Sequence, residues 1–276
     1  RVLAAFATAS YEHAAAVKQF LKYTEFESQW LDHVIQDIKE ANDHTLTNII
    51  YSHALIGIFP SQKLLKAWYK VAGDLSTFQS HALSLSLWSL AKLYVRPPES
   101  FIRSWYIAFR REASNFDERG LANMVWSFGK LGIQPSAEFL ALTGELFERS
   151  AFAWHSQALS NFLWGLAKLQ AQPNVNVVRA WSNRFLEISA EFTSRELSIS
   201  LWSFATLDVV PPRQVLKAWA AQFEKKLSSF DSQNLANSIW AIAKLNIQPT
   251  ESFLEIWTQK FMQVMKRTND QELSNA

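Results

Sequence analysis

The chain has 276 residues, of which 49% are hydrophobic, and 27 Lys and Arg against 25 Asp and Glu give a net charge of +2. This hydrophobic content excludes a disordered chain, and the near-neutral balance excludes a strong overall field that would attract nucleic acid or acidic lipid. Cys is absent, which excludes a disulfide scaffold, a Cys-ligated zinc or iron–sulfur site and a cysteine nucleophile.

Large residues recur along the chain with a period of 38. One column is Trp88, Trp126, Trp164, Trp202 and Trp240, and a second is Pro97, Pro135, Pro173, Pro211 and Pro249. A further Trp column runs through Trp105, Trp181, Trp219 and Trp257, with Thr143 at its single gap. Because several columns share one spacing, the sequence predicts a repeat protein.

The repeats divide the chain in order. Residues 1–41 are a degenerate repeat, and 42–276 are an array whose members are 42–78, 79–116, 117–154, 155–192, 193–230, 231–268 and the start of another at 269. The first residue is Arg and the last repeat has barely begun, so we expect a piece of a longer protein. No run of about 18 apolar residues occurs, so we expect no membrane-spanning helix.

Each repeat predicts two helices, as 117–154 illustrates. Asp117 is a suitable N-cap for the first helix, Gly132 and Pro135 mark its end, and Ser136 can cap the second helix. No repeat shows sustained alternation of period two, so no strand is expected. Because a lone helix pair cannot bury its wide apolar face, we predict an all-α fold, an α-solenoid superhelix of stacked two-helix repeats. The Trp and Phe columns, including that of Trp126, are expected to pack between the layers.

The core of the repeat resembles a known family. Leu121-Ala122-Asn123-Met124-Val125-Trp126, followed by Pro135, recurs as Leu235-Ala236-Asn237-Ser238-Ile239-Trp240, followed by Pro249. This pattern is similar to that of the octotricopeptide repeat family, whose repeat is also 38 residues long. The resemblance implies stacked helical hairpins that bind single-stranded RNA in the stability, processing or translation of transcripts, or that clasp RNA within an organellar ribosome among other proteins. It implies a mitochondrion or chloroplast, with bacterial cytoplasm or a secreted effector as the other compartments.

A helical wheel leaves one arc of the first helix for contact with RNA. That arc carries a Lys ladder at its carboxyl end, suited to phosphate, and more variable residues suited to base edges. The candidate residues are His81, Lys92, Arg119, Gly120, Asn123, Lys130, Gln157, Asn161, Lys168, Arg195, Glu196, Gln233, Asn234, Asn237 and Lys244. The same columns also fit structural roles, with Asn123, Asn161 and Asn237 bonding to a neighbouring repeat and the Lys residues favoured by the helix dipole.

Motifs of catalysis are missing from the sequence. There is no Gly-rich phosphate loop, HExxH or GxSxG, and the six His residues are scattered, so we expect neither an enzyme nor a bound metal or cofactor. Two functions remain open. The Lys ladder and the resemblance favour binding of single-stranded RNA, whereas the near-neutral charge favours a protein-binding α-solenoid scaffold.

Overall fold

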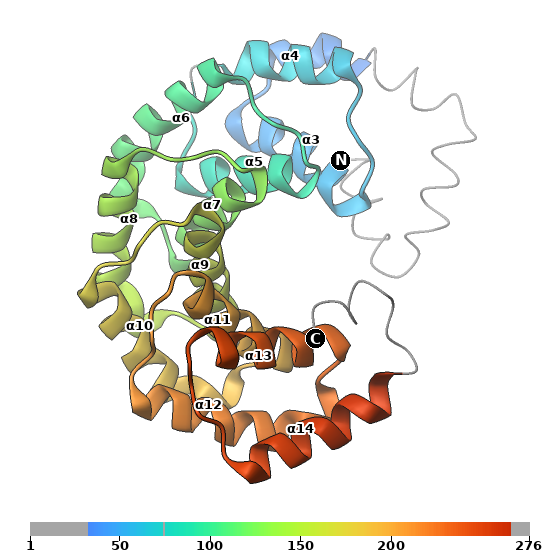
Figure 1. Ribbon diagram of the computed structural model, residues 1–276. Coiled ribbons are helices and arrows are strands. Elements are labelled where there is room, and N and C mark those ends of the chain that lie inside the picture. The colour runs from blue at the N-terminus through green and yellow to red at the C-terminus, as the bar shows by residue number, and fades with distance from the viewer. Residues whose placement is uncertain (1–32, 74, 266–276) are drawn as a thin grey trace. The chain divides into compact units, whose positions relative to one another are not determined.

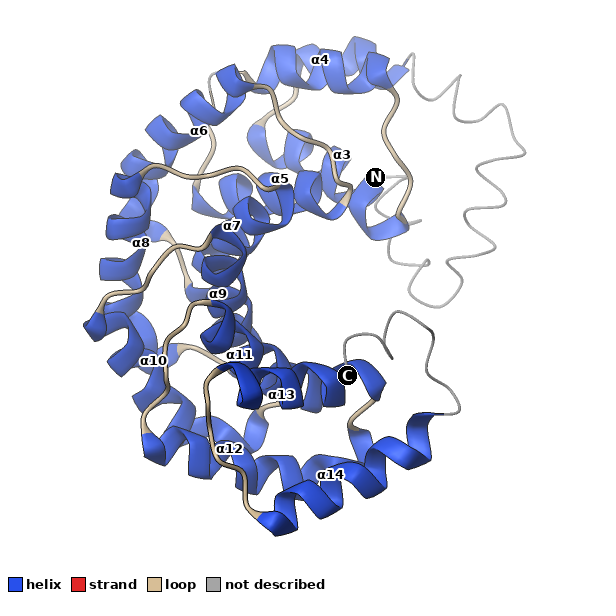
Figure 2. Cartoon of the chain, viewed as in Figure 1, coloured by secondary structure: helices blue, strands red, loops and turns tan. Residues whose placement is uncertain are grey.

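The structure, a computed structural model, describes residues 33–73 and 75–265. Every regular element within these residues is helical, and no strand is present among them (Figure 2). The chain divides into two compact units, Arg1–Leu131 and Gly132–Ala276. Most of the predicted degenerate repeat at 1–41, and the repeat start at 269, lie outside the described residues.

The first unit stacks its helices in two rows. Its helices are α3 (Asp43–Ile56), α4 (Gln62–Ala72), α5 (Ser80–Lys92), α6 (Glu99–Glu112) and α7 (Glu118–Leu131), with 3-10 turns at Ile38–Glu40 and Ala113–Asn115. The first helices of successive repeats form one row, in which α5 packs between α3 and α7 (Figure 1). The second helices α4 and α6 form the other row.

The second unit repeats the same arrangement. Its helices are α8 (Ala137–Ser150), α9 (Ser156–Leu169), α10 (Val175–Ile188), α11 (Ser194–Thr206), α12 (Arg213–Lys226), α13 (Ser232–Lys244) and α14 (Glu251–Val264), with 3-10 turns at Ala151–Ala153, Ser189–Glu191 and Leu227–Ser229. Here α11 packs between α9 and α13, while α10 packs between α8 and α12. The predicted all-α solenoid of stacked helix pairs is therefore confirmed.

The helix ends follow the predicted signals. Asp117 Oδ1 accepts the backbone N–H of Gly120 at 2.7 Å, and Ser136 caps α8 in the same way. The first helix of each repeat is followed by one residue with positive φ. These residues are Gly57, Tyr94, Gly132, Gln170, Asp208 and Asn246. Only Gly adopts this left-handed conformation without steric cost, so Gly57 and Gly132 suit the position best.

The interior between the rows is filled by the Trp residues of the second helices. Each of these indoles donates its N–H to the carbonyl oxygen of a Leu 22 residues earlier, in the first helix of the same repeat. The pairs are Trp68 with Leu46 (2.8 Å), Trp105 with Leu83 (3.2 Å), Trp181 with Leu159 (3.1 Å), Trp219 with Leu197 (2.9 Å) and Trp257 with Leu235 (3.2 Å). One side chain thus joins the two helices of a repeat, and its large ring is buried in all of these repeats except the last, where Trp257 is half-buried.

Candidate nucleic-acid interface

Four positions on the first helix of each repeat stay at the surface. They are spaced i, i+4, i+7 and i+11, which places them on one face of a helix. We call this face the first-helix stripe. In the first unit it comprises His44, Asn48, Tyr51 and Leu55 on α3; His81, Leu85, Trp88 and Lys92 on α5; and Arg119, Asn123, Trp126 and Lys130 on α7. In the second unit it comprises Gln157, Asn161, Trp164 and Lys168 on α9; Arg195, Ile199, Trp202 and Thr206 on α11; and Gln233, Asn237, Trp240 and Lys244 on α13. Every one of these side chains is exposed or half-buried.

The stripe is narrower than the arc predicted from the sequence. Gly120 and Asn234 are buried, and a Cβ at position 120 would lie only 3.1 Å from the Phe116 ring. Glu196 is half-buried and accepts the backbone N–H of Thr193 in a capping box. The physical reason is that a first helix inside a solenoid has a neighbouring first helix on each flank, as α11 has in α9 and α13. Gly120 and Asn234 are buried and leave the candidate surface, whereas Glu196 stays half-buried at the amino end of α11, where its carboxylate is held by the cap.

The stripe carries positive charge without acidic residues. Its Lys and Arg side chains are Lys92, Arg119, Lys130, Lys168, Arg195 and Lys244, and no Asp or Glu occupies any stripe position. The charge on this face is therefore far more positive than the net charge of +2 of the whole chain suggests. A local concentration of this kind attracts anions even when the protein as a whole is near neutral.

Two of the stripe lysines lie against aromatic rings. Lys130 Nζ is 4.3 Å from the centre of the Tyr94 ring, and hydrogen bonding to Lys130, followed by its charge, lowers the pKa of Tyr94. Lys168 Nζ lies 5.8 Å from the ring of Trp164 and 5.1 Å from that of Trp202. These distances are in the range of cation–π attraction. Within the described residues, no ion pair occupies Lys92, Lys130, Lys168 or Lys244, so their charge remains available to an anion.

The Asn column has unused hydrogen-bonding capacity. Asn123, Asn161 and Asn237 are half-buried, and their side chains form no hydrogen bond within the part of the chain that the structure describes. The sequence also allowed a structural role for these Asn side chains, a hydrogen bond to a neighbouring repeat. Within the described residues they form no such bond. Each amide offers two donors and one acceptor oxygen, which is the set that reads a base edge.

The Trp column of the first helices lies on the stripe and not in the deep core, but its rings do pack between neighbouring repeats as predicted, since Tyr51 lies 5.9 Å from Trp88, ring centre to ring centre. Trp88, Trp126, Trp164 and Trp202 are half-buried, and Trp240 is 40% exposed. The rings of Trp202 and Trp240 are 6.3 Å apart with an angle of 32° between them. These rings, together with Asn48 and Tyr51 of α3, are candidate contact residues that the sequence reasoning missed. The sequence did contain a pattern that could have identified them. The Trp lies three residues after the Asn and four residues before the Lys, and this spacing places all three side chains on one face of the helix.

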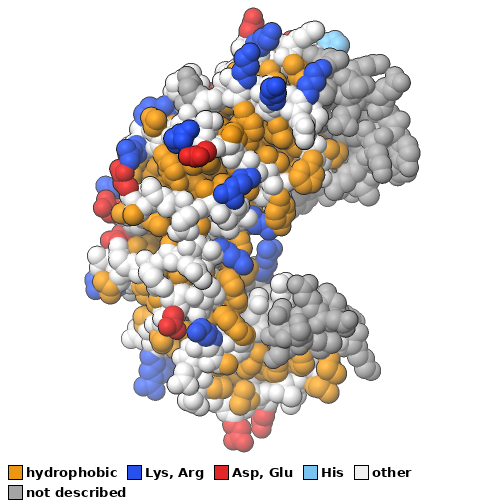
Figure 3. Space-filling view, turned by 45° about the horizontal axis from the view of Figure 1, so that its top comes forward, with side chains coloured by type: hydrophobic (Ala, Val, Ile, Leu, Met, Phe, Trp, Pro, Cys, Tyr) orange, Lys and Arg blue, Asp and Glu red, His pale blue; other side chains and the backbone are white. Residues whose placement is uncertain are grey.

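Hydrophobic and cationic side chains lie next to one another on the surface of the protein (Figure 3). Figure 3 shows Lys and Arg side chains set among exposed hydrophobic side chains on the face that it presents. In residues 33–73 and 75–265, no three His, Asp or Glu side chains are grouped closely enough to hold a metal ion. Over the same residues, no helix has both the length and the apolar character needed to cross a bilayer.

The chain matches one known family over most of its length. The family is described as the N-terminal domain of the Tbc2 translation factor, and its model matches residues 71–246 and again residues 145–276. The two matches start 74 residues apart, close to two repeats, as expected when an array fits a repetitive model in two registers. A comparison with curated proteins found no match. The chain belongs to the family of the Tbc2 translation factor N-terminal domain.

Proposed function

We propose that this chain binds single-stranded RNA along the first-helix stripe and acts in translation or in the fate of a transcript. The observation that carries the proposal is the stripe itself, where cations, unused amides and half-exposed Trp rings recur in step with the repeat. The family match supports a role in translation, because the matching family is described as a domain of a translation factor. The chain needs no catalytic group for this role, and we propose a binding protein rather than an enzyme.

The side chains of the stripe suit three features of an unpaired nucleotide: its phosphate, the edge of its base and the face of its base. Lys side chains neutralise phosphates, which lowers affinity as salt rises. Asn, Gln and Arg side chains can hydrogen-bond to the edges of unpaired bases, and a different side chain at one position can favour a different base. A half-exposed Trp ring offers a face on which a base of any sequence can stack. The stripe therefore combines affinity from Lys and Trp with selectivity from the variable first position.

A finer classification follows from the repeat core. The 38-residue period and the Leu-Ala-Asn-x-x-Trp pattern support an octotricopeptide-like array, and that resemblance favours a mitochondrion or chloroplast as its compartment. Its RNA could be a transcript or the RNA of an organellar ribosome. Other proteins of the same ribonucleoprotein would then be its neighbours.

A protein-binding scaffold is the second candidate. The net charge of +2 and the 40% exposure of Trp240 favour it, because exposed aromatic side chains are common anchors of protein interfaces. The two candidates differ in salt dependence. Binding of RNA should weaken log-linearly as salt rises, whereas docking of an apolar peptide should not.

Selectivity is tested by changing one variable side chain. Arg119→Gln gives repeat 117–154 the Gln–Asn pair that Gln157 and Asn161 already form in the next repeat. If each repeat reads one base, the base preference should change at one nucleotide, with the neighbouring positions unchanged. Sequencing RNA selected by the protein from a randomised pool measures this directly.

The matched control for this change is Arg103→Gln. Arg103 lies on the second helix α6, where it pairs with Glu99 at the surface, and its loss removes the same charge away from the stripe. The control should leave the selected RNA sequence unchanged. A loss of affinity by Arg119→Gln that is equal for every RNA, with no positional change, would contradict base reading at this position.

A further inference from the structure

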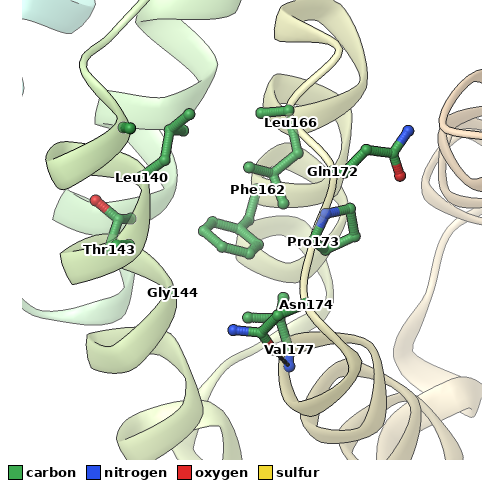
Figure 4. A pocket seen from close by; sticks show the side chains of 12 residues that line it. Leu140, Thr143, Gly144, Phe162, Leu166, Gln172, Pro173, Asn174 and Val177 are labelled. Carbon is green, nitrogen blue, oxygen red and sulfur yellow. Dashed lines mark hydrogen bonds between the residues drawn. The ribbon is translucent and has the colours of Figure 1, made fainter.

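The second unit contains a pocket at the one place where the interior Trp column is interrupted. The pocket has a volume of about 320 Å³ and lies between α8, α9 and the start of α10 (Figure 4). Thr143 lines it and occupies the column of Trp105 and Trp181, each 38 residues away. The pocket thus forms beside a position where other repeats place an indole.

The neighbours of that missing indole are also smaller than in other repeats. Around Trp105 the rings of Tyr106, Phe109 and Phe128 lie 5.3 to 5.8 Å away, centre to centre. The corresponding residues one repeat later are Gly144, Phe147 and Leu166, so two of the three rings are replaced by smaller side chains. Gly144 and Leu166 both line the pocket. The smaller residues at several equivalent positions of this repeat therefore act together to leave the space that forms the pocket.

Phe162 fills part of this space. Its column holds Ser86, Met124, Ser200 and Ser238 in the other repeats. The Phe162 ring stacks on Phe147 at 4.6 Å with 15° between the planes, and it forms one wall of the pocket. This compensation is incomplete, because the pocket remains beside it.

The remaining walls are mostly apolar, with one unused polar atom. Leu140, Leu166 and Val177 contribute aliphatic surface, while exposed Gln172 and Asn174 border the pocket from the loop before α10. Thr143 is only 1% exposed, and its Oγ1 has no hydrogen-bond partner. Because that oxygen has almost no accessible surface, recognition in the pocket rests on shape and apolar contact and not on this hydroxyl.

We propose that this pocket binds a small, flat, bicyclic aromatic molecule of indole size. The occupant follows from the repeat, since the same column elsewhere holds an indole supplied by the chain. The volume of about 320 Å³ lies at the lower end of small-molecule sites, and apolar cavities of smaller volume already accept single aromatic rings. This inference is independent of RNA binding.

Indole itself is the probe, and saturation-transfer NMR with the 276-residue chain is the measurement. We expect saturable binding with a Kd on the order of 0.1–1 mM for a ligand of this size. Thr143→Trp supplies the ring from the chain and should weaken binding at least tenfold. Thr143→Leu, a smaller change that fills less of the pocket, should weaken it severalfold and serves as the second variant should Thr143→Trp fail to fold.

Naphthalene, a bicyclic ring of similar size without an N–H, separates shape from hydrogen bonding. Because recognition rests on shape, naphthalene should bind with a Kd within severalfold of that of indole, and the isosteric control Thr143→Val, which keeps the pocket, should change neither value by more than about twofold. The inference is overturned by an absence of saturable indole binding to the unchanged chain, or by Thr143→Trp and Thr143→Leu variants that bind indole as tightly as the unchanged chain does. RNA affinity, measured on the same samples, should change less than twofold on Thr143→Trp, so failure of one proposal is distinguishable from failure of the other.

Discussion

Trp181→Ala is expected to lower the free energy of unfolding by about 3–5 kcal/mol, the cost of removing a large, fully packed ring. Trp181 is 2% exposed, stacks on Phe185 at 5.2 Å and meets Phe204 edge-on at 4.9 Å. Its indole N–H also donates to Leu159 O at 3.1 Å, so the substitution removes a bond between the two helices of one repeat. Urea denaturation followed by circular dichroism measures the loss, fitted with a nearest-neighbour repeat model because arrays need not unfold in one step.

Trp240→Ala is the matched control for that experiment. It removes the same side chain from a site that is 40% exposed and has no interior packing, so it should cost clearly less than Trp181→Ala. Equal losses for Trp181→Ala and Trp240→Ala would contradict the division of the Trp residues into an interior column and a surface column.

Replacing the four stripe lysines is expected to have the largest effect on RNA affinity. Each Lys that neutralises a phosphate of a single strand contributes about 0.7 to the slope of log affinity against log salt. Lys92, Lys130, Lys168 and Lys244 changed together to Gln should therefore lower the slope by about 2.8 and weaken binding roughly 100-fold at about 0.15 M salt. The loss should be similar for every RNA sequence, because phosphate contacts carry no base information. Fluorescence anisotropy titrations at several salt concentrations measure both quantities.

The control removes the same charge from the second helices. Lys66, Lys70, Lys217 and Lys225 are exposed on α4 and α12, and their replacement by Gln changes the net charge equally. This variant should keep most of the slope. If both quadruple variants lose the same affinity and the same slope of log affinity against log salt, the lysines act only through overall charge. The proposal that RNA contacts the stripe would then be wrong.

The sequence predicted the fold well because the repeat multiplies each local signal. Capping side chains recur at one spacing before the first helices, as at Asp117, Thr193 and Asp231, and predict where those helices begin. The turn after the first helix recurs too, although only one of the 38-residue repeats from 79 onward places Gly there, at Gly132. A signal that is weak in one repeat becomes strong when it returns every 38 residues. The 3-10 turns that end several second helices, such as Ala113–Asn115, carried no such signal and were not predicted.

The candidate site was predicted only in part, since periodicity shows which residues are equivalent but not which are buried. Trp126 and Trp181 belong to columns of the same spacing, yet one lies on the surface stripe and the other in the interior. A wheel drawn for one helix also ignores its neighbours. Asn234 falls on the polar arc of such a wheel, although stacking leaves it 7% exposed.

Contact of RNA with the first helices is tested most directly by photocrosslinking. A single-stranded RNA containing 4-thiouridine, selected for binding to the chain, is irradiated in the complex, and the crosslinked residues are identified by mass spectrometry. Crosslinks are predicted at stripe residues within 81–92, 119–130, 157–168, 195–206 and 233–244, spaced by the 38-residue repeat. Crosslinks concentrated on the second helices α6, α8, α10 and α12, or scattered without that period, would contradict RNA binding along the stripe.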